Sequence, residues 1–229
     1  MVYVKRGLFP ACCVLCAAPV RGFLDLCPPC IAELPLHVDA CPRCAMPLAT
    51  AATTACGRCQ RQPPAFNACI AALRYEYPVP ELIGRFKFHG DLAAGHALAL
   101  LLARDVAGRE AGNGSGSVLL PVPLHRTRLA ERGFNQSERI ARVLAHELGL
   151  PMQPTLAVRT RHTEDQKSLD AGARRRNLGM AFSASDCRGR RIVLVDDVIT
   201  TGATADALAA TLLAAGAQRV EAWCLARAL

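Results

Sequence analysis

The chain has 229 residues, 52% of them hydrophobic and 20% charged, with a formal net charge of +8. This composition argues against an intrinsically disordered chain and favours one α/β domain with a small additional module. The apolar run Leu98–Ala103 is too short to span a bilayer and no secretory signal is recognisable, so we expect a cytoplasmic protein. The basic excess lies in residues 1–66 and 121–177, which favours a polyanionic partner, although single arginines can simply be solubilising.

The first predicted unit is a cysteine-rich head at residues 1–66. Nine of the twelve cysteines fall between residues 12 and 59, and eight of them form four Cys-x-x-Cys pairs: Cys13/Cys16, Cys27/Cys30, Cys41/Cys44 and Cys56/Cys59. Two such pairs supply the four thiolates of a closed tetrahedral site, so the spacing predicts two structural zinc sites with four cysteine ligands each. Joining successive pairs is the simplest assignment, and an interleaved arrangement stays open.

The remaining cysteines have plainer interpretations. Cys12 is either an alternative ligand or inert, and Cys69, Cys187 and Cys224 are predicted to be small buried apolar residues. A thioredoxin-type redox motif is excluded, because it needs a single Cys-x-x-Cys on a βαβ unit. A head of this size would depend on its metal for stability.

From Cys69 onward, strand-like and helix-like segments alternate. The expected strands are residues 69–77, 118–121, 155–160, 191–195 and 219–226. The expected helices are residues 80–88, 91–107, 135–148 and 203–215, and 108–117 and 122–134 are expected to be loops. Asn135 and Glu138 resemble a capping box, and Gly149 is a predicted helix stop. This alternation predicts a mainly parallel α/β sheet in a domain at residues 67–229.

The most informative stretch runs from Val193 to Thr204. A buried strand ends in Asp196 and Asp197, and a Thr/Gly turn then opens a helix. A helix start presents backbone N–H groups to phosphate, and a glycine lets the backbone approach closely. The predicted phosphate-binding residues are Thr200, Thr201, Gly202, Ala203 and Thr204. Two acids beside a phosphate would repel it unless they accept hydrogen bonds from sugar hydroxyls or lie near a metal, so the pattern indicates a phosphorylated sugar. A turn that merely caps a helix is the plainer alternative.

This stretch resembles the motif of type I phosphoribosyltransferases that binds phosphoribosyl pyrophosphate (PRPP). The resemblance implies that Asp196 and Asp197 are catalytic-site acids that contact the ribose 2′- and 3′-hydroxyls, while the Thr/Gly loop holds the 5′-phosphate. A P-loop is excluded because its glycine and lysine pattern is absent. A dinucleotide-binding fingerprint is excluded because the glycines at 112–116 follow no strand.

Further motifs extend the resemblance to the ComF family, which joins a cysteine-rich zinc head to such a domain. The motifs are residues 86–91, 121–125 and 132–137, Gln166, Arg175-x-Asn177 and Ala181-Phe182. The resemblance implies a type I phosphoribosyltransferase fold with helices on both faces of the sheet. It also implies a role in competence and DNA uptake, with single-stranded DNA and DNA-uptake or DNA-processing proteins as candidate partners.

The resemblance also implies a pyrophosphate site in the loop that follows an early strand. The residues expected there are Leu124, His125, Arg126 and Arg132, with Lys87 reaching the same anion from another loop and Arg128 as a further cation. Lys87 could equally be a solvated surface lysine. The segment Arg159–Asn177 resembles the mobile loop that closes over PRPP, or else is a solvated arginine-rich helix face.

The implied reaction is displacement of pyrophosphate from PRPP by an acceptor, with Mg²⁺ bound mainly to substrate oxygens. The acceptor has no recognisable signature. The alternative is a non-catalytic, zinc-dependent protein that binds single-stranded DNA and whose PRPP site is a sensor or a relic. Against this alternative, Trp223 falls in a predicted core strand and Phe134 is the only aromatic residue of the basic segment 121–177. A scaffold that docks through its zinc head is the third interpretation.

Overall fold

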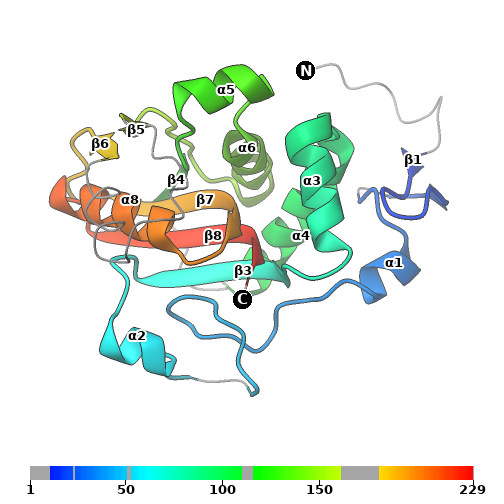
Figure 1. Cartoon of the computed structure of the whole chain (residues 1–229), viewed down its shortest axis with the longest axis horizontal. Coiled ribbons are helices and arrows are strands. Elements are labelled where there is room, and N and C mark those ends of the chain that lie inside the picture. The colour runs from blue at the N-terminus through cyan, green and yellow to red at the C-terminus, as the bar shows by residue number, and fades with distance from the viewer. Residues whose placement is uncertain (1–10, 23, 51–52, 110–115, 161–180, 229) are drawn as a thin grey trace, which may run out of the picture.

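The computed structural model describes residues 11–22, 24–50, 53–109, 116–160 and 181–228 (Figure 1). The strands are β1 (Ala11–Cys12), β2 (Pro19–Val20), β3 (Ala68–Arg74), β4 (Ser117–Pro121), β5 (Ala157–Arg159), β6 (Phe182–Ala184), β7 (Arg191–Ile199) and β8 (Arg219–Arg227). The helices are α1 (Pro28–Ala32), α2 (Gly57–Arg61), α3 (Val79–His89), α4 (Leu92–Arg109), α5 (Arg126–Arg132), α6 (Gln136–Leu148) and α8 (Ala203–Ala214). The predictions for Gln166, for Arg175-x-Asn177 and for the closing loop beyond residue 160 lie outside the described residues.

The main sheet has four strands in the order β3-β8-β7-β4, and every neighbouring pair is parallel. Alternate residues of these strands enter two different hydrophobic clusters, because successive side chains of a strand point to opposite faces. One cluster joins Val193, Val195 and Trp223 to α3, α4 and α6. The other joins Leu194 and Cys224 to α8. The predicted parallel sheet with helices on both faces is therefore confirmed.

Several element boundaries differ from the prediction. Strand β7 continues through both acids to Ile199, because Asp196, Val198 and Ile199 stay in register with β8. Residues 126–132, expected to be loop, form α5, which is capped by an acceptor on the side chain of His125 and is ended by the left-handed residue Gly133. Among the described residues, strands β5 and β6 pair with each other in a separate antiparallel sheet. Cys69, Cys187 and Cys224 are buried, as predicted.

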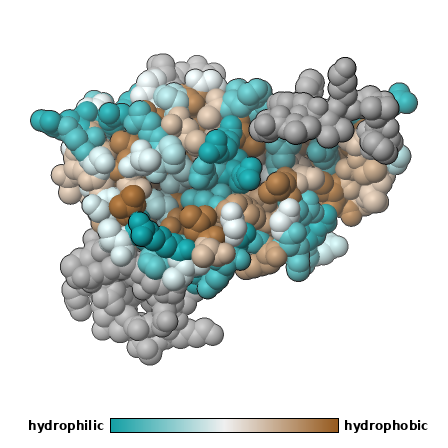
Figure 2. Space-filling model, turned by 90° about the horizontal axis from the view of Figure 1, so that it is seen from above, coloured by the Kyte–Doolittle hydropathy of each residue, from teal (hydrophilic) through white to brown (hydrophobic). Residues whose placement is uncertain are grey.

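The head is divided between two places. Figure 1 shows β1 to the right of α3 with α1 below them, whereas α2 lies at the lower left, below β3. Leu36 bridges to Leu73 at the edge of the main sheet, and Phe66 is buried in the cluster that contains α8. The head–domain boundary at residue 66 stays a prediction. No helix among the described residues has both the length and the apolar character of a membrane span, and in Figure 2 apolar patches on the visible face are separated by hydrophilic residues.

The packing of α3 against α4 leads to a first prediction. A Cβ atom at Gly95 in α4 would lie 2.8 Å from Cγ of Phe86 and closer still to two other ring atoms, and Phe86 is only 1% exposed. Gly95→Ala should therefore destabilise the protein by about 1–3 kcal/mol, as overpacking does. Gly84→Ala in α3 is the matched control, because a Cβ there meets nothing within 4 Å, and the better helix propensity of alanine should raise the melting temperature slightly. Thermal unfolding checks both variants, and equal shifts would contradict this packing.

Candidate functional site

The eight paired cysteines form two quartets, Cys13/Cys16/Cys27/Cys30 and Cys41/Cys44/Cys56/Cys59, within each of which all Sγ atoms lie within 4.8 Å of one another. The Sγ–Sγ distance is 3.6 Å for Cys16 and Cys27 and 3.8 Å for Cys44 and Cys56. A tetrahedron with Zn–S bonds of about 2.3 Å has edges of about 3.8 Å. The quartets therefore fit structural zinc, and successive pairs share a site rather than interleaving.

The pKa values of the cysteine thiols within each quartet also fit a site for a metal cation. Burial raises the pKa of the Cys41 thiol, but backbone N–H donors led by Cys56 outweigh it and lower that pKa to about 7. Likewise burial raises the pKa of Cys13, and the amides of Cys16 and Cys27 bring it down to about 6. Burial raises the pKa of Cys44 to about 11. In each quartet the pKa of one thiol is lowered, at Cys13 and Cys41, while that of another is raised, at Cys16 and Cys44. A divalent metal would hold all four cysteines of a quartet as thiolates.

The predicted phosphate-binding loop connects β7 to α8. Gly202 is the N-cap of α8 and has a φ of +81°, the left-handed conformation that glycine adopts without strain. Thr201 lies directly before it, and its Oγ1 accepts a hydrogen bond of 3.3 Å from the Ala203 amide. Thr200 and Thr201 are exposed. A left-handed glycine and an exposed threonine pair at a helix start are suited to binding an anion with backbone amides and hydroxyls.

Asp196 lies in β7, three residues before the strand ends at Ile199, and a side chain from another element contacts it. Its Oδ1 accepts hydrogen bonds from Ser137 Oγ at 3.1 Å and from the Asp197 amide at 2.9 Å. Burial, and after it the charge of Asp197, raise the pKa of Asp196 to about 7. Ser137 belongs to the first turn of α6, which Asn135 caps by accepting from the Ser137 amide. The expected capping residue is thus confirmed, and its helix delivers Ser137 to the acid.

Asp197 is 4% exposed and pairs with Lys87 of α3, whose Nζ lies 2.9 Å from Asp197 Oδ1. The same oxygen accepts from the Val198 amide at 2.6 Å. The other oxygen, Oδ2, is buried and has no hydrogen-bond partner among the described residues. Buried carboxylate oxygens are normally hydrogen-bonded, so this atom is an acceptor suited to a ligand donor.

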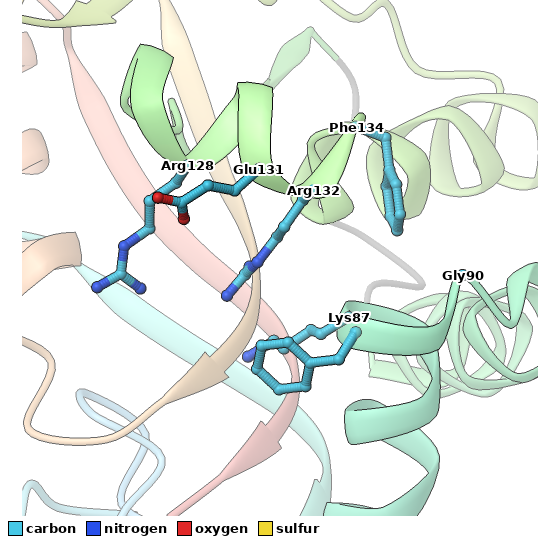
Figure 3. Close-up of a pocket in the computed structure, with 7 residues that line it drawn as sticks. Lys87, Gly90, Arg128, Glu131, Arg132 and Phe134 are labelled. Atoms are coloured by element: carbon cyan, nitrogen blue, oxygen red, sulfur yellow. The ribbon is translucent and has the colours of Figure 1, made fainter.

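A cavity of about 440 Å³ lies between α3 and α5. Figure 3 shows Lys87, Arg128 and Arg132 extending toward this space from the two helices. Arg132 also stacks over the ring of Phe88, with 5.2 Å between its guanidinium carbon and the ring centroid. Arg128 and Arg132 face the single acid Glu131, while the charge of Lys87 is matched by Asp197. The lining therefore carries a net positive charge, which suits an anion.

The residues predicted for pyrophosphate are brought together only in part. Lys87 and Arg132 line the cavity with Arg128, whereas Leu124, His125 and Arg126 are not among its lining residues. Nδ1 of His125 accepts from the Thr127 amide, so this side chain caps α5. Lys87 is 18% exposed and ion-paired, which makes the solvated-lysine interpretation wrong.

Two family profiles match the chain. The profile described as "Double zinc ribbon domain" matches residues 4–60, and "Phosphoribosyl transferase domain" matches residues 132–229. The chain is 36% identical over 180 residues to "Competence protein F" of Haemophilus influenzae, an alignment that covers 76% of this chain and 78% of the relative. The chain belongs to the ComF family.

Other relatives extend this assignment. The chain is similar to "DNA utilization protein YhgH" of Escherichia coli (strain K12), with 36% identity over 224 residues, 96% of this chain and 98% of the relative. It is 28% identical over 142 residues to "Competence protein ComFC" of Bacillus subtilis, covering 62% of this chain and 56% of the relative. A solved structure titled as glutamine PRPP amidotransferase from B. subtilis aligns over 57% of this chain and 26% of its own, with 23% identity and a TM-score of 0.39.

In this ComF protein the site includes one residue, Ser137, that the sequence motifs did not assign to it. Ser137 lies in the motif at residues 132–137, yet its contact with Asp196 joins residues 59 positions apart. In the sequence, Ser137 was marked only by its place in that motif, at the start of an expected helix, and neither feature indicates a contact with Asp196. The ComF double zinc ribbon and phosphoribosyltransferase fold are confirmed, while the role of each site residue stays a prediction.

Proposed function

We propose that this ComF protein binds PRPP and transfers its phosphoribosyl group to an acceptor. The observation that carries the proposal is the position of two acids in β7, followed after four residues by the left-handed glycine that opens α8. Asp196 accepts only from Ser137 Oγ and one amide among the described contacts, and Asp197 Oδ2 is buried without a partner among the described residues. Ribose hydroxyls would donate to these oxygens, and Thr200, Thr201, Gly202, Ala203 and Thr204 would hold the 5′-phosphate.

The positive cavity between α3 and α5 supports placement of the pyrophosphate. Lys87 joins the two halves of the proposed site, because it lines the cavity and also pairs with Asp197. Arg128 and Arg132 would stabilise the charge that develops as pyrophosphate leaves, which is the main way in which such a site lowers a barrier. Mg²⁺ would be held by PRPP oxygens, with Asp196 and Asp197 as the available carboxylates, and would supply further charge stabilisation.

Calorimetry of the zinc-loaded chain with PRPP in magnesium buffer tests the proposal. We expect saturable binding of one PRPP per chain, and a screen for pyrophosphate release with different nitrogenous acceptors would then identify turnover. Saturable binding with no release for any acceptor would favour a PRPP sensor. The absence of saturable binding would refute the enzymatic function.

A second candidate function, binding of single-stranded DNA in DNA uptake, is favoured by one observation. Tyr75, Tyr77 and Phe88 are 38%, 80% and 69% exposed, and exposed aromatic rings are the surfaces on which unpaired bases stack. The sequence argued against DNA binding because Trp223 was expected to be buried and segment 121–177 has one aromatic residue. Trp223 is indeed fully buried, but the three exposed rings lie outside that segment and are available for stacking. Fluorescence titration with single-stranded oligonucleotides at two salt concentrations tests it, since phosphate-driven binding weakens steeply with salt. A cytoplasmic location and DNA-processing partners stay proposals.

A further inference from the structure

The second zinc quartet, Cys41/Cys44/Cys56/Cys59, adjoins the proposed phosphate loop through a buried arginine. Arg227 ends β8 and is only 1% exposed. Its Nε donates to the carbonyl of Cys44 at 3.0 Å. Its Nη1 donates to the carbonyls of Ile199, at 2.8 Å, and of Thr200. One planar guanidinium therefore ties a zinc knuckle to the two residues that lead from β7 into the loop.

Two more hydrogen bonds join the same side of the head to the loop and to α8. Arg58 lies between Cys56 and Cys59, and its guanidinium donates to the carbonyl of Thr201 at 3.2 Å. The Ala65 amide donates to Asp206 Oδ1, in the first turn of α8, at 2.6 Å. Phe66 lies near the loop without bonding to it, since a Cβ atom added at Gly202 would lie 4.0 Å from Phe66 Cζ. The second quartet thus supports the start of the loop through Arg58 and Arg227, and the segment that follows the quartet supports α8 through Ala65.

Arg227 is a buried cation whose charge has no ion-pair partner among the described residues. No carboxylate among the described residues forms an ion pair with it, so its buried charge is met by carbonyl oxygens. A buried cation without an anionic partner is costly. Two anions would compensate it: the zinc tetrathiolate on one side, which carries a net negative charge, and a phosphate bound in the loop on the other.

The first quartet, Cys13/Cys16/Cys27/Cys30, has a different neighbour. Arg85 of α3 donates from Nη1 to the carbonyl of Val14 at 2.7 Å. Among the hydrogen bonds of the described residues, none links residues 11–34 to residues 199–206. The two quartets, similar in sequence, therefore support different parts of the domain, and the first provides an internal control for the second.

We propose that the second zinc site helps to build the ribose-phosphate site. In this arrangement Arg227 and Arg58 are positioning residues that hold the carbonyls of residues 199–201, so that the amides and hydroxyls of the loop face the 5′-phosphate. Zinc fixes the two knuckles from which these contacts come. The inference rests on the proposed function, because it assigns the loop to a sugar phosphate.

The test uses the full zinc-loaded chain and ribose 5-phosphate, which lacks the pyrophosphate group and so reports on the loop alone. Arg58→Ala should weaken ribose 5-phosphate binding about 3- to 10-fold in calorimetry while the chain keeps two zinc ions. Arg227→Lys keeps the charge but loses the planar fork, and should weaken binding more than 10-fold. Both variants should weaken PRPP by the same factor as ribose 5-phosphate and leave inorganic pyrophosphate binding unchanged, a selectivity that general destabilisation would not produce.

The matched metal-site variants are Cys56→Ser and Cys27→Ser, each at the first cysteine of the second pair in its quartet. Each should lose one zinc per chain. Cys56→Ser should lower ribose 5-phosphate affinity at least 10-fold and speed amide hydrogen exchange at residues 199–206 in the ligand-free chain, whereas Cys27→Ser should leave both within twofold of wild type. Cys27 is the more buried of the two, so burial alone predicts the opposite order.

The outcomes separate this inference from the proposed function. If wild type binds ribose 5-phosphate and both Arg58→Ala and Cys56→Ser bind it equally well, the inference is overturned and the proposed function stands. Equal losses in Cys27→Ser and Cys56→Ser would also overturn it, because the effect would then be general. If wild type binds neither ribose 5-phosphate nor PRPP, the proposed function fails, and faster exchange only in Cys56→Ser would show that the structural support exists without that ligand.

Discussion

Asp196→Asn combined with Asp197→Asn should weaken PRPP binding at least about 100-fold, which corresponds to about 2.7 kcal/mol. Above pH 7, where Asp196 is mostly ionised, the two carboxylates would be replaced by neutral amides, and hydrogen bonds to charged groups are worth about 1.5–3 kcal/mol each. The buried Asp197 Oδ2, unpartnered among the described residues, is the atom whose loss should matter most. Calorimetry with PRPP in magnesium buffer measures the effect.

The control for removing negative charge is Asp186→Asn. Asp186 pairs with Arg188 in the turn before β7, and both side chains are largely exposed, so this variant should bind PRPP within twofold of wild type. Affinity of the double variant for single-stranded oligonucleotides should stay close to wild type, because the acids are not cationic phosphate contacts. If the double variant loses PRPP and oligonucleotide binding together, the two ligands do not bind to separate surfaces. If it binds PRPP as tightly as wild type, the two acids are not part of the PRPP site.

The sequence predicted the order of strands and helices well because their signals are local. Apolar runs bounded by glycine identify β4, β7 and β8, and the left-handed Gly149 ends α6 where expected. The end of β7 was wrong because two adjacent acids are typical of a strand terminus, whereas register with β8 carries the strand through them. Helix α5 was missed because histidine is an uncommon cap and the segment was interpreted as a proline- and arginine-rich loop.

The candidate site was predictable where its residues are consecutive in the sequence. The eight cysteines and the acid–Thr/Gly stretch each form a short pattern whose chemistry follows from residue type and spacing. The contacts that join elements were not predictable, because Lys87–Asp197, Ser137–Asp196 and Arg227–Cys44 bring together residues distant in the chain. A lone lysine, serine or arginine has no local pattern that distinguishes it from a surface residue, so its role depends on the packing of α3, α6 and β8 against β7.

Lys87→Met should lower the stability of the ligand-free chain by about 2–3 kcal/mol near pH 8. This is less than the roughly 3–5 kcal/mol for breaking a fully buried pair, because the Lys87 side chain is 18% exposed. The change leaves Asp197, whose side chain is 6% exposed, without its counter-charge beside a second carboxylate. For a chain of this size the melting temperature should fall about 4–10 °C. Lys87→Met with Asp197→Asn should recover most of this loss, as a double-mutant cycle of an interacting pair does.

The pH dependence distinguishes charge from packing in this prediction. Burial, together with Asp197, raises the pKa of Asp196 to about 7 in the folded chain, so the native state binds this proton more tightly than the unfolded state. Its contribution to stability is therefore full below about pH 4 and declines as pH rises toward 7. Without Lys87, whose charge lowers that pKa, the pKa should rise further and the decline should steepen and extend above pH 7. Denaturant unfolding from pH 5 to 8.5 should show the penalty of Lys87→Met growing with pH. A penalty independent of pH would instead mean that Lys87 stabilises the chain through its aliphatic stem, and its ion pair with Asp197 would then have no part in the site's stability.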